Sequence, residues 1–182
     1  SFLGHYLTQT LAETTSIHGV FLEVLGTGVL IKGDAGVGKS ELALELITRG
    51  HRLVADDVVD LKHVAPKTLE GICPPLIRDF LEVRGLGILN IRVLFGEMAV
   101  KPQKNLKLIV ELVHPQEIGK AGLNRLDMVA STETILGVAI PKVCIPVAAG
   151  RNLAVLIEVA VRNHILRSRG INPLEQLIKR QQ

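Results

Sequence analysis

The chain has 182 residues, 47% of them hydrophobic, so it can form one domain with a substantial core and is short for two. Its formal net charge of +3 is too small to indicate a nucleic-acid-binding protein, and an aromatic content of 3% with no Trp leaves few platforms for base stacking. No apolar run reaches the roughly 18 residues that span a membrane, and no signal peptide is evident, so we expect a cytoplasmic protein whose two cysteines, Cys73 and Cys144, are reduced.

The first predicted unit is a β-hairpin. Residues 20–25, apolar except for Glu23, and the apolar residues 29–31 have strand character, and glycines at 26 and 28 mark a turn between them. His18 lies just before this hairpin. By itself, a histidine in such a position is more often a surface or packing residue than a catalyst, so the local pattern favours a structural role.

A glycine-rich segment follows the hairpin. Residues 33–40 match the pattern G-x-x-x-x-G-K-[ST] at every defined position, and apolar residues at helical spacing predict a helix that ends near Gly50. In this arrangement, backbone amides and the helix N-terminus surround a phosphate. Lys39 would reach the β- and γ-phosphates of a nucleotide, and the Ser40 hydroxyl would bind Mg²⁺. The predicted phosphate loop consists of Gly33, Asp34, Ala35, Gly36, Val37, Gly38, Lys39 and Ser40.

Two consecutive aspartates follow the next predicted strand. Apolar residues at 53–55 lead into Asp56 and Asp57, which is the form of a Walker B strand, whose Asp holds or orients Mg²⁺. Because only positions 40–55 separate Lys39 from Asp56, this strand follows the phosphate-loop helix directly. Paired aspartates can form a solvated turn, or one can accept a proton while the other assists the metal. The phosphate loop upstream favours the functional interpretation.

The middle of the chain predicts antiparallel strands and a ligand-facing loop. Residues 58–64 and 68–72 have strand character. The segment 81–91 contains two glycines with a Glu and an Arg close by, which look like a loop that approaches a ligand. Apolar residues at 88–95 then recur at helical spacing and predict a short buried helix. An ordinary loop before a core helix explains the same spacing, and spacing alone favours it.

The second half of the chain predicts a central strand, edge strands and two helices. Residues 106–113 form the clearest central strand, and 114–132 are polar and predict a surface loop. Residues 134–147 alternate weakly and contain two prolines, as in edge strands. The segment 148–152 opens a long helix, and a short helix closes the chain. We therefore predict one α/β domain with much antiparallel character and C-terminal helices.

From about His18 to about Arg169, the chain resembles the C-terminal catalytic domain of the HPr kinase/phosphorylase family. Those bacterial enzymes phosphorylate a serine of the phosphocarrier HPr and also remove the phosphate. The phosphate loop alone is shared with many nucleotide enzymes, whereas the segment 81–88, following an Asp-Asp strand, is much more specific. The resemblance is carried by residues 33–40, 50–57, 81–88 and 146–152.

The resemblance implies a role for each matching residue. Lys39 is the phosphate-binding lysine, and His18, in contrast to its local pattern, is an active-site histidine. Asp57 takes the proton of the substrate serine during phosphorylation and returns one in the reverse reaction, with Asp56 as its neighbour. Ser40 and Glu82 are Mg²⁺ ligands, and Arg125 is a catalytic arginine. The segment important for phosphate removal is Pro146, Val147, Ala148, Ala149, Gly150 and Arg151.

The resemblance also implies the fold, activity and partners. The family's catalytic domain is similar in fold to phosphoenolpyruvate carboxykinase, which implies a P-loop α/β domain with mixed and antiparallel strands over residues 1–182. We expect the family's N-terminal domain to be absent from this chain. The implied activity is ATP- and Mg²⁺-dependent serine phosphorylation of HPr or an HPr-like paralogue, together with phosphorolysis by inorganic phosphate that releases pyrophosphate. The family forms hexamers, and a mean hydropathy of +0.34 also favours apolar surface between subunits.

Two alternative functions remain open. One is a P-loop enzyme that acts on a small molecule, such as a metabolite kinase, and the other is a regulatory module that binds ATP without chemistry. The segment 82–88 argues against the first. The complete set of Lys39, Ser40, Asp56 and Asp57 argues against the second.

Overall fold

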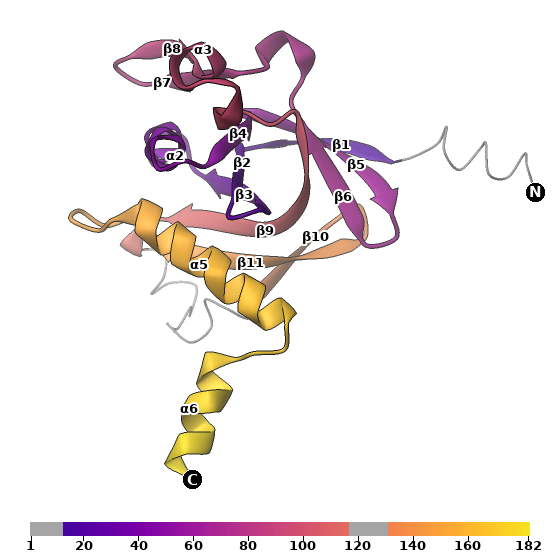
Figure 1. Cartoon of the computed structure of the whole chain (residues 1–182), viewed down its shortest axis with the longest axis vertical. Helices are drawn as coiled ribbons and strands as arrows, with labels where there is room; N and C mark the ends of the chain where they lie inside the picture. Colours follow the sequence, from indigo (N-terminus) through magenta and orange to yellow (C-terminus); the bar gives the residue numbers. More distant parts are fainter. Residues whose placement is uncertain (1–12, 117–130) are drawn as a thin grey trace, which may run out of the picture.

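Strand β9 (Gln103–Val113) is the central strand of a curled, mixed sheet (Figure 1). It pairs in parallel with β3 and β11 and antiparallel with β6, which confirms the predicted central strand. The computed structural model describes residues 13–116 and 131–182, and within these ranges nine strands form this sheet. They are β1 (Thr14–His18), β2 (Val20–Val24), β3 (Thr27–Gly33), β4 (Arg52–Ala55), β5 (Val58–Ala65), β6 (Thr68–Ile72), β9, β10 (Ser131–Ile135) and β11 (Val138–Pro146).

Two helices cover one face of the sheet. Helix α2 (Lys39–Thr48) and helix α5 (Leu153–Ser168) lie beside each other in one layer (Figure 1). Helix α6 (Pro173–Gln181) extends away from this body and has no buried residue. None of the described helices is long and apolar enough to cross a membrane. The predicted mixed α/β fold with C-terminal helices is therefore confirmed.

The two faces of the sheet build two separate cores. Side chains alternate between faces along a strand, so Val20 and Leu22 of β2 pack in the cluster that contains the apolar residues of α2 and α5. Phe21, between them, packs in the opposite cluster with Val59, Leu61 and other residues of the curled half of the sheet. This curled half closes over the second face, and the α2–α5 layer covers the first.

A small second sheet stands next to helix α2. Strands β7 (Phe80–Val83) and β8 (Gly87–Asn90) pair antiparallel, and helix α3 (Ile91–Phe95) follows directly. Figure 1 shows the three elements together at the top of the view. The ligand-facing loop predicted over 81–91 is thus a hairpin whose turn lies at 84–86.

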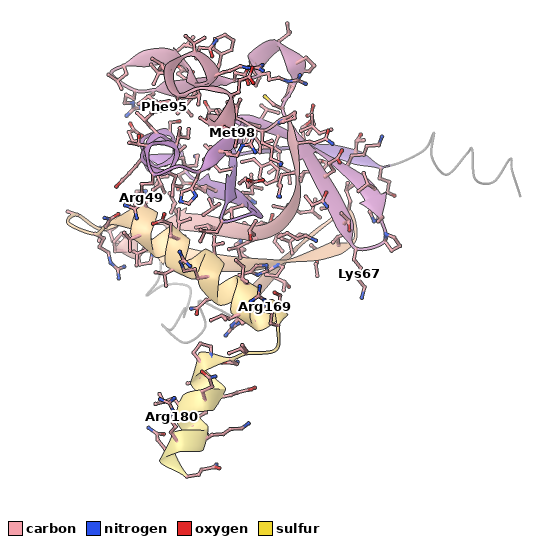
Figure 2. The ribbon with its side chains drawn as sticks, in the orientation of Figure 1. Arg49, Lys67, Phe95, Met98, Arg169 and Arg180 are labelled. Atoms are coloured by element: carbon pink, nitrogen blue, oxygen red, sulfur yellow. The ribbon has the colours of Figure 1, made fainter. Side chains whose placement is uncertain are left out.

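The sequence predicts a short buried helix over 88–95, and the predicted burial is wrong. Ile88 belongs to β8 and is 71% exposed, and within α3 only Ile91 is buried. Phe95, the last residue of α3, and Met98, which follows this unit, are also exposed; Figure 2 labels both. The small sheet packs only one face on the α2 core, through Leu81 and Val83, so helical spacing here does not report burial.

Glu158 of α5 binds the two residues that flank Gly50 at the C-terminal end of α2. Its Oε1 accepts hydrogen bonds from Arg49 Nε at 3.0 Å and from Nη2 at 2.5 Å, and its Oε2 lies 2.6 Å from Nε2 of the buried His51. The hydrogen bonds from Arg49, and then that with His51, lower the pKa of the Glu158 carboxyl below its ordinary value. Sequence reasoning did not find this contact.

Gly71 of β6 leaves room for the ring of Phe21. A Cβ atom at position 71 would lie 2.2 Å from Cε2 of Phe21, so steric space requires glycine here. We predict that Gly71→Ala lowers the free energy of unfolding by about 1–3 kcal/mol, as overpacking does in cores. Urea unfolding measures it. In a Phe21→Leu background the same change should cost less, and an equal cost in both backgrounds would show that the ring is not the obstacle.

The Glu158 contact makes stability depend on pH. Because the folded-state pKa is lowered, the stabilisation is present above the ordinary carboxyl pKa of about 4.3 and is lost as the pH falls through the folded-state value. We predict that Glu158→Gln destabilises the protein near pH 7, and that wild type and variant converge as the pH falls below about 4. Urea unfolding from pH 3 to 8 tests this. Glu175→Gln, on exposed α6, is the matched control, and a pH-independent difference would contradict the assignment.

Candidate active site

The carboxyl ends of several strands meet at one edge of the sheet. Strands β3, β9 and β11 run parallel, with Gly33 paired to Leu112 and Pro146 paired to Val113. Strand β4 also runs in the direction of β3, since both pair antiparallel with β2. The segments after β3, β4 and β11 therefore leave the sheet at the same edge, which is where open sheets bind ligands.

The phosphate loop connects β3 to α2, as predicted. Gly36 and Gly38 have φ values of +85° and +98°, which non-glycine residues rarely adopt. An added Cβ at either position would contact at most the Glu41 carboxylate, at 3.8 Å, so glycine serves the backbone conformation there. Val37 anchors the loop, because its side chain is buried in the α2 core and its N–H donates to Asp34 O at 3.2 Å.

Lys39 is the first residue of α2, and its side chain folds back over the loop. Its Nζ donates to the carbonyl oxygens of Gly33 and Asp34, the latter at 3.2 Å. Ser40 follows it in the first turn of the helix and is partly buried. A cationic ammonium and a hydroxyl are thus held at a helix N-terminus, where the helix dipole attracts anions.

Asp56 is a buried carboxyl just beyond the end of β4. It is 9% exposed, and its Oδ2 accepts a hydrogen bond from the N–H of Glu82 at 3.0 Å. Burial raises the pKa of Asp56 above its ordinary value, the Glu82 hydrogen bond opposes that rise, and the charges of Asp57 and Glu82 reinforce it. This contact brings hairpin β7–β8, with its exposed Glu82, to the carboxyl edge.

Asp57 and His18 lie together at the surface. His18 ends β1 opposite Val58, the first residue of β5, and its Nδ1 lies 4.0 Å from Asp57 Oδ1. Their side chains are 87% and 79% exposed. Asp57 has φ +68°, and its carbonyl accepts the N–H of Gly19 at 3.1 Å. The structure therefore places side by side two residues that lie 39 positions apart in the sequence.

The segment 146–151 follows β11 at the same edge. The Val147 N–H donates to Val113 O at 2.8 Å, which continues the pairing of β11 with β9 for one residue. Arg151 is exposed, and α5 begins at Leu153 rather than within 148–152, because Asn152 caps the helix by accepting the N–H of Val155. Arg125 lies outside the described residues.

Potential metal ligands are sparse in the described part of the chain. No group of three or more His, Cys, Asp or Glu side chains there is arranged to hold a metal ion alone. Ser40 and Glu82 supply oxygen atoms, and Asp56 supplies a buried carboxyl beside Glu82. Mg²⁺ favours such oxygen donors and is commonly bound through one or two carboxylates together with substrate phosphates. The residue types therefore fit Mg²⁺.

Comparisons with known proteins agree with this geometry. Residues 9–181 match the family model described as HPr Serine kinase C-terminal domain. An HPr kinase/phosphorylase of Chromobacterium violaceum is 60% identical over 175 residues, which are 96% of this chain and 55% of that protein. One of Nitrosomonas europaea is 60% identical over 178 residues, which are 98% of this chain and 55% of that protein. The chain thus spans about half the length of the curated relatives it matches.

A solved structure has the same fold. The Hpr(Ser) kinase/phosphatase of Coxiella burnetii aligns with a TM-score of 0.80 and 43% identity, over 86% of this chain and 93% of that one. The P-loop, phosphoenolpyruvate carboxykinase-like fold class and the resemblance identified in the sequence are both confirmed. With a family model that covers residues 9–181 and relatives at 60% identity, this chain belongs to the HPr serine kinase C-terminal domain family.

Proposed function

We propose that the chain is the catalytic domain of a bifunctional enzyme. In one direction it transfers the γ-phosphoryl group of ATP to a serine of HPr or an HPr-like paralogue of the phosphotransferase system. In the other, inorganic phosphate removes that group and pyrophosphate is released. The observation that carries this proposal is the convergence of the phosphate loop, the Asp56–Asp57 pair and Glu82 at one sheet edge.

The loop and Lys39 position and neutralise the transferred phosphates. Phosphoryl transfer depends mostly on positioning and on stabilising negative charge. The Lys39 ammonium donates to two loop carbonyl oxygens and needs only to turn from them to reach a phosphate above the loop. Ser40, Glu82 and the buried Asp56 would hold Mg²⁺, which when bound supplies further positive charge at the phosphates. The same residues serve both directions, because both transfer the same group.

Asp57 is the proposed general base. A serine hydroxyl is a weak nucleophile, so a carboxylate must accept its proton as it attacks. Asp57, at 79% exposure, can be reached by a residue on the surface of another protein, whereas Asp56 is buried and engaged by the Glu82 amide. His18, 4.0 Å from Asp57, lies where it can orient this carboxylate. An exposed base favours a protein substrate over the small-molecule alternative.

The segment 146–151 is the proposed second anion site for the reverse reaction. The attacking phosphate must be held beside a phosphoserine that itself carries about −1.5 to −2 in charge. Arg151 offers an exposed guanidinium at the same sheet edge as the phosphate loop, and such a group can bind phosphate through two parallel hydrogen bonds. The resemblance assigns Arg125 a catalytic role alongside it.

We also propose a cytoplasmic homohexamer. Apolar side chains are exposed on two parts of the chain. One is α3 and the turn after it, with Leu94, Phe95 and Met98, and the other is helix α6, with Leu177 and Ile178. Figure 2 shows Phe95 and Met98 on one side of the molecule and α6 on another. Exposed apolar side chains that gather into a patch are typical of protein interfaces, so both parts are candidate contacts between subunits.

The proposed function predicts a phosphoserine product that depends on Lys39. The purified chain is mixed with ATP, Mg²⁺ and HPr, and phosphoserine is measured by mass spectrometry; phosphate is then added in place of ATP and pyrophosphate is measured. Lys39→Ala should reduce both rates by at least about 10²-fold without changing the urea midpoint. Lys62→Ala, on the exposed side of β5, should leave both rates unchanged. Near-normal turnover in Lys39→Ala would refute the phosphate-loop assignment.

The base assignment predicts a separation of rate from binding at Asp57. Asn is nearly isosteric with Asp but accepts no proton, so Asp57→Asn should lower the kinase rate at saturating ATP by about 10²–10⁴-fold with little change in the Kd for ATP. Asp60→Asn is the matched control, because it alters a nearby carboxylate of β5 that accepts a hydrogen bond from Ser16 of β1. Collapse of ATP affinity with an unchanged saturated rate would make Asp57 a ligand and Asp56 the better candidate base.

A further inference from the structure

Four charged side chains form a connected network near the carboxyl edge of the main sheet. They are Lys32 of β3, Glu111 of β9, Glu133 of β10 and Lys142 of β11. Lys32 Nζ donates to Glu133 Oε2 at 2.8 Å, and Lys142 Nζ donates to Glu133 Oε1 at 3.2 Å. Lys142 Nζ also lies 2.6 Å from Glu111 Oε2. The Glu133 carboxylate therefore joins the strand that leads into the phosphate loop to the strand that leads into the segment 146–151.

The network lies between the core cluster that contains Phe21 and the carboxyl edge. Residues two positions apart on a strand share a face of the sheet. Each charged residue stands two positions from a buried apolar residue of that cluster, on the side of the carboxyl edge, and β10 fits this pattern because it runs antiparallel to β11. The pairs are Leu30 with Lys32, Ile109 with Glu111, Ile140 with Lys142, and Ile135 with Glu133.

Partial burial makes these contacts stronger than ordinary surface ion pairs. The four side chains are 20–31% exposed. Burial acts to raise the pKa of Glu133, but the hydrogen bonds from Lys32 and Lys142 outweigh it and hold the pKa below its ordinary value. Removing one partner of a partly buried pair costs more than removing an exposed pair, because the other charge keeps its desolvation cost. Glu133 thus restrains β3 and β11 relative to each other.

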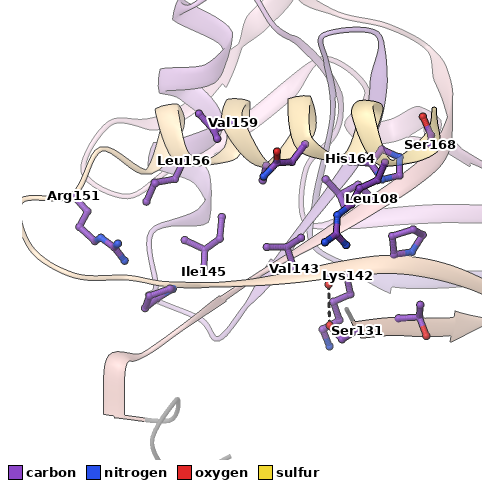
Figure 3. A pocket seen from close by; sticks show the side chains of 16 residues that line it. Leu108, Ser131, Lys142, Val143, Ile145, Arg151, Leu156, Val159, His164 and Ser168 are labelled. Atoms are coloured by element: carbon purple, nitrogen blue, oxygen red, sulfur yellow. Dashed lines mark hydrogen bonds between the residues drawn. The ribbon is translucent and has the colours of Figure 1, made fainter. Parts of the chain in front are cut away.

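The two restrained strands end at the two proposed anion sites. Lys32 directly precedes Gly33, the first residue of the phosphate loop, and Lys142 lies four positions before Pro146. The backbone of Lys142 is held as well, since Ser131 Oγ donates to its carbonyl oxygen at 2.8 Å, a bond that Figure 3 shows as a dashed line. A shift of β3 against β11 would therefore change the separation of the two anion sites.

We propose that Glu133 is a positioning residue for phosphorolysis, which acts through Lys32 and Lys142 to set the separation between the phosphate loop and the segment 146–151. This role rests on the function proposed above. In phosphorolysis, an oxygen of inorganic phosphate bonds to the phosphorus of phosphoserine and the phosphorus–oxygen bond to serine breaks. The serine oxygen takes the proton that Asp57 returns, and pyrophosphate leaves.

The two directions of the reaction differ in their need for this separation. The phosphates of ATP are held by the phosphate loop and Lys39, whichever way the segment 146–151 lies. The attacking phosphate must instead be held in line with the phosphoserine by groups from both sites. A displacement of about 1 Å can cost about 10²-fold when reacting groups must be aligned. Loosening the network should therefore weaken the use of inorganic phosphate more than the use of ATP.

A second cluster of the same composition allows a matched control. The Glu23 carboxylate lies 3.3 Å from Lys101 Nζ and 3.0 Å from Lys104 Nζ, and its side chain is partly buried. Glu23 pairs with Gly28 near the start of β3, so this cluster lies at the opposite edge of the sheet. If ion clusters of this kind only stabilise the fold, removing Glu23 and removing Glu133 should have the same effect on catalysis.

The test compares Glu133→Gln with Glu23→Gln in both directions of the reaction. Rates are measured against the concentration of ATP with HPr, and against the concentration of inorganic phosphate with serine-phosphorylated HPr. Glu133→Gln should raise the KM for inorganic phosphate about tenfold, with less than about a twofold change in the KM for ATP and in the kinase kcat. Glu23→Gln should leave all of these unchanged, and urea unfolding compares the stabilities of the two variants. Equal changes for ATP and for phosphate in Glu133→Gln, or equal effects of the two variants, would overturn the proposal.

Lys32→Met tests the same contact from the other side and serves if Glu133→Gln fails to fold. It should also raise the KM for inorganic phosphate and spare the kinase constants. Because the two residues act as a unit, the double variant should have the phosphate KM of Glu133→Gln, and single effects that multiply would contradict the proposal. A wild-type chain that releases no pyrophosphate would contradict the proposed function and this role with it. Equal effects of Glu133→Gln and Glu23→Gln on an active enzyme would contradict the role of Glu133 alone.

Discussion

The pairing of β9 with its two parallel neighbours is the constraint on which the rest of this structure depends. Parallel strands need a crossover connection between them, and those connections supply helices for the faces. Helix α2 follows β3, and α5 follows β11, so both helices leave from the carboxyl edge and return over the same face. The phosphate loop and the segment 146–151 therefore share an edge, although β9 separates the strands that precede them.

Asp56 shows how a buried charge joins separate parts of the site. A carboxylate taken out of water is costly unless hydrogen bonds compensate, and the Glu82 amide supplies one such bond across two sheets. This bond does not fully offset the cost of burying the charge, so the pKa of Asp56 stays above its ordinary value. A nearby cation would relieve it, which is the electrostatic reason that this corner suits Mg²⁺. Asp57, one residue later, faces water, so neighbouring carboxyls have different environments and can take different roles.

The parts of the fold that local sequence specifies were predicted correctly. The phosphate loop, the strand before it and the helix after it occupy a continuous segment, and glycine, lysine and serine have fixed places in it. The hairpin β2–β3 and the strands β5, β6 and β9 followed from alternation and turn residues.

Contacts between distant segments could not be predicted from the residues. The approach of His18 to Asp57 depends on the register of β1 against β5, and the contact of His51 with Glu158 joins positions 107 residues apart. The exposure of residues 88–95 could not be predicted from their spacing either, because helical spacing of apolar residues is the same whether or not another element covers them. For His18 only the family resemblance supplied the functional interpretation, and its local setting favoured a structural one.

The Glu158 contact has a mechanical consequence for the phosphate loop. Arg49 and His51 flank Gly50, so the carboxylate holds helix α2 at the end opposite to Lys39. A helix of this length spans about 15 Å. A small rotation of α2 about the Glu158 contact would therefore displace its opposite end. A tilt of about 4° would carry the Lys39 end by about 1 Å, a displacement that can cost about 10²-fold in rate when reacting groups must be aligned. Through Glu158, helix α5 thus influences the position of the phosphate loop at the opposite end of α2.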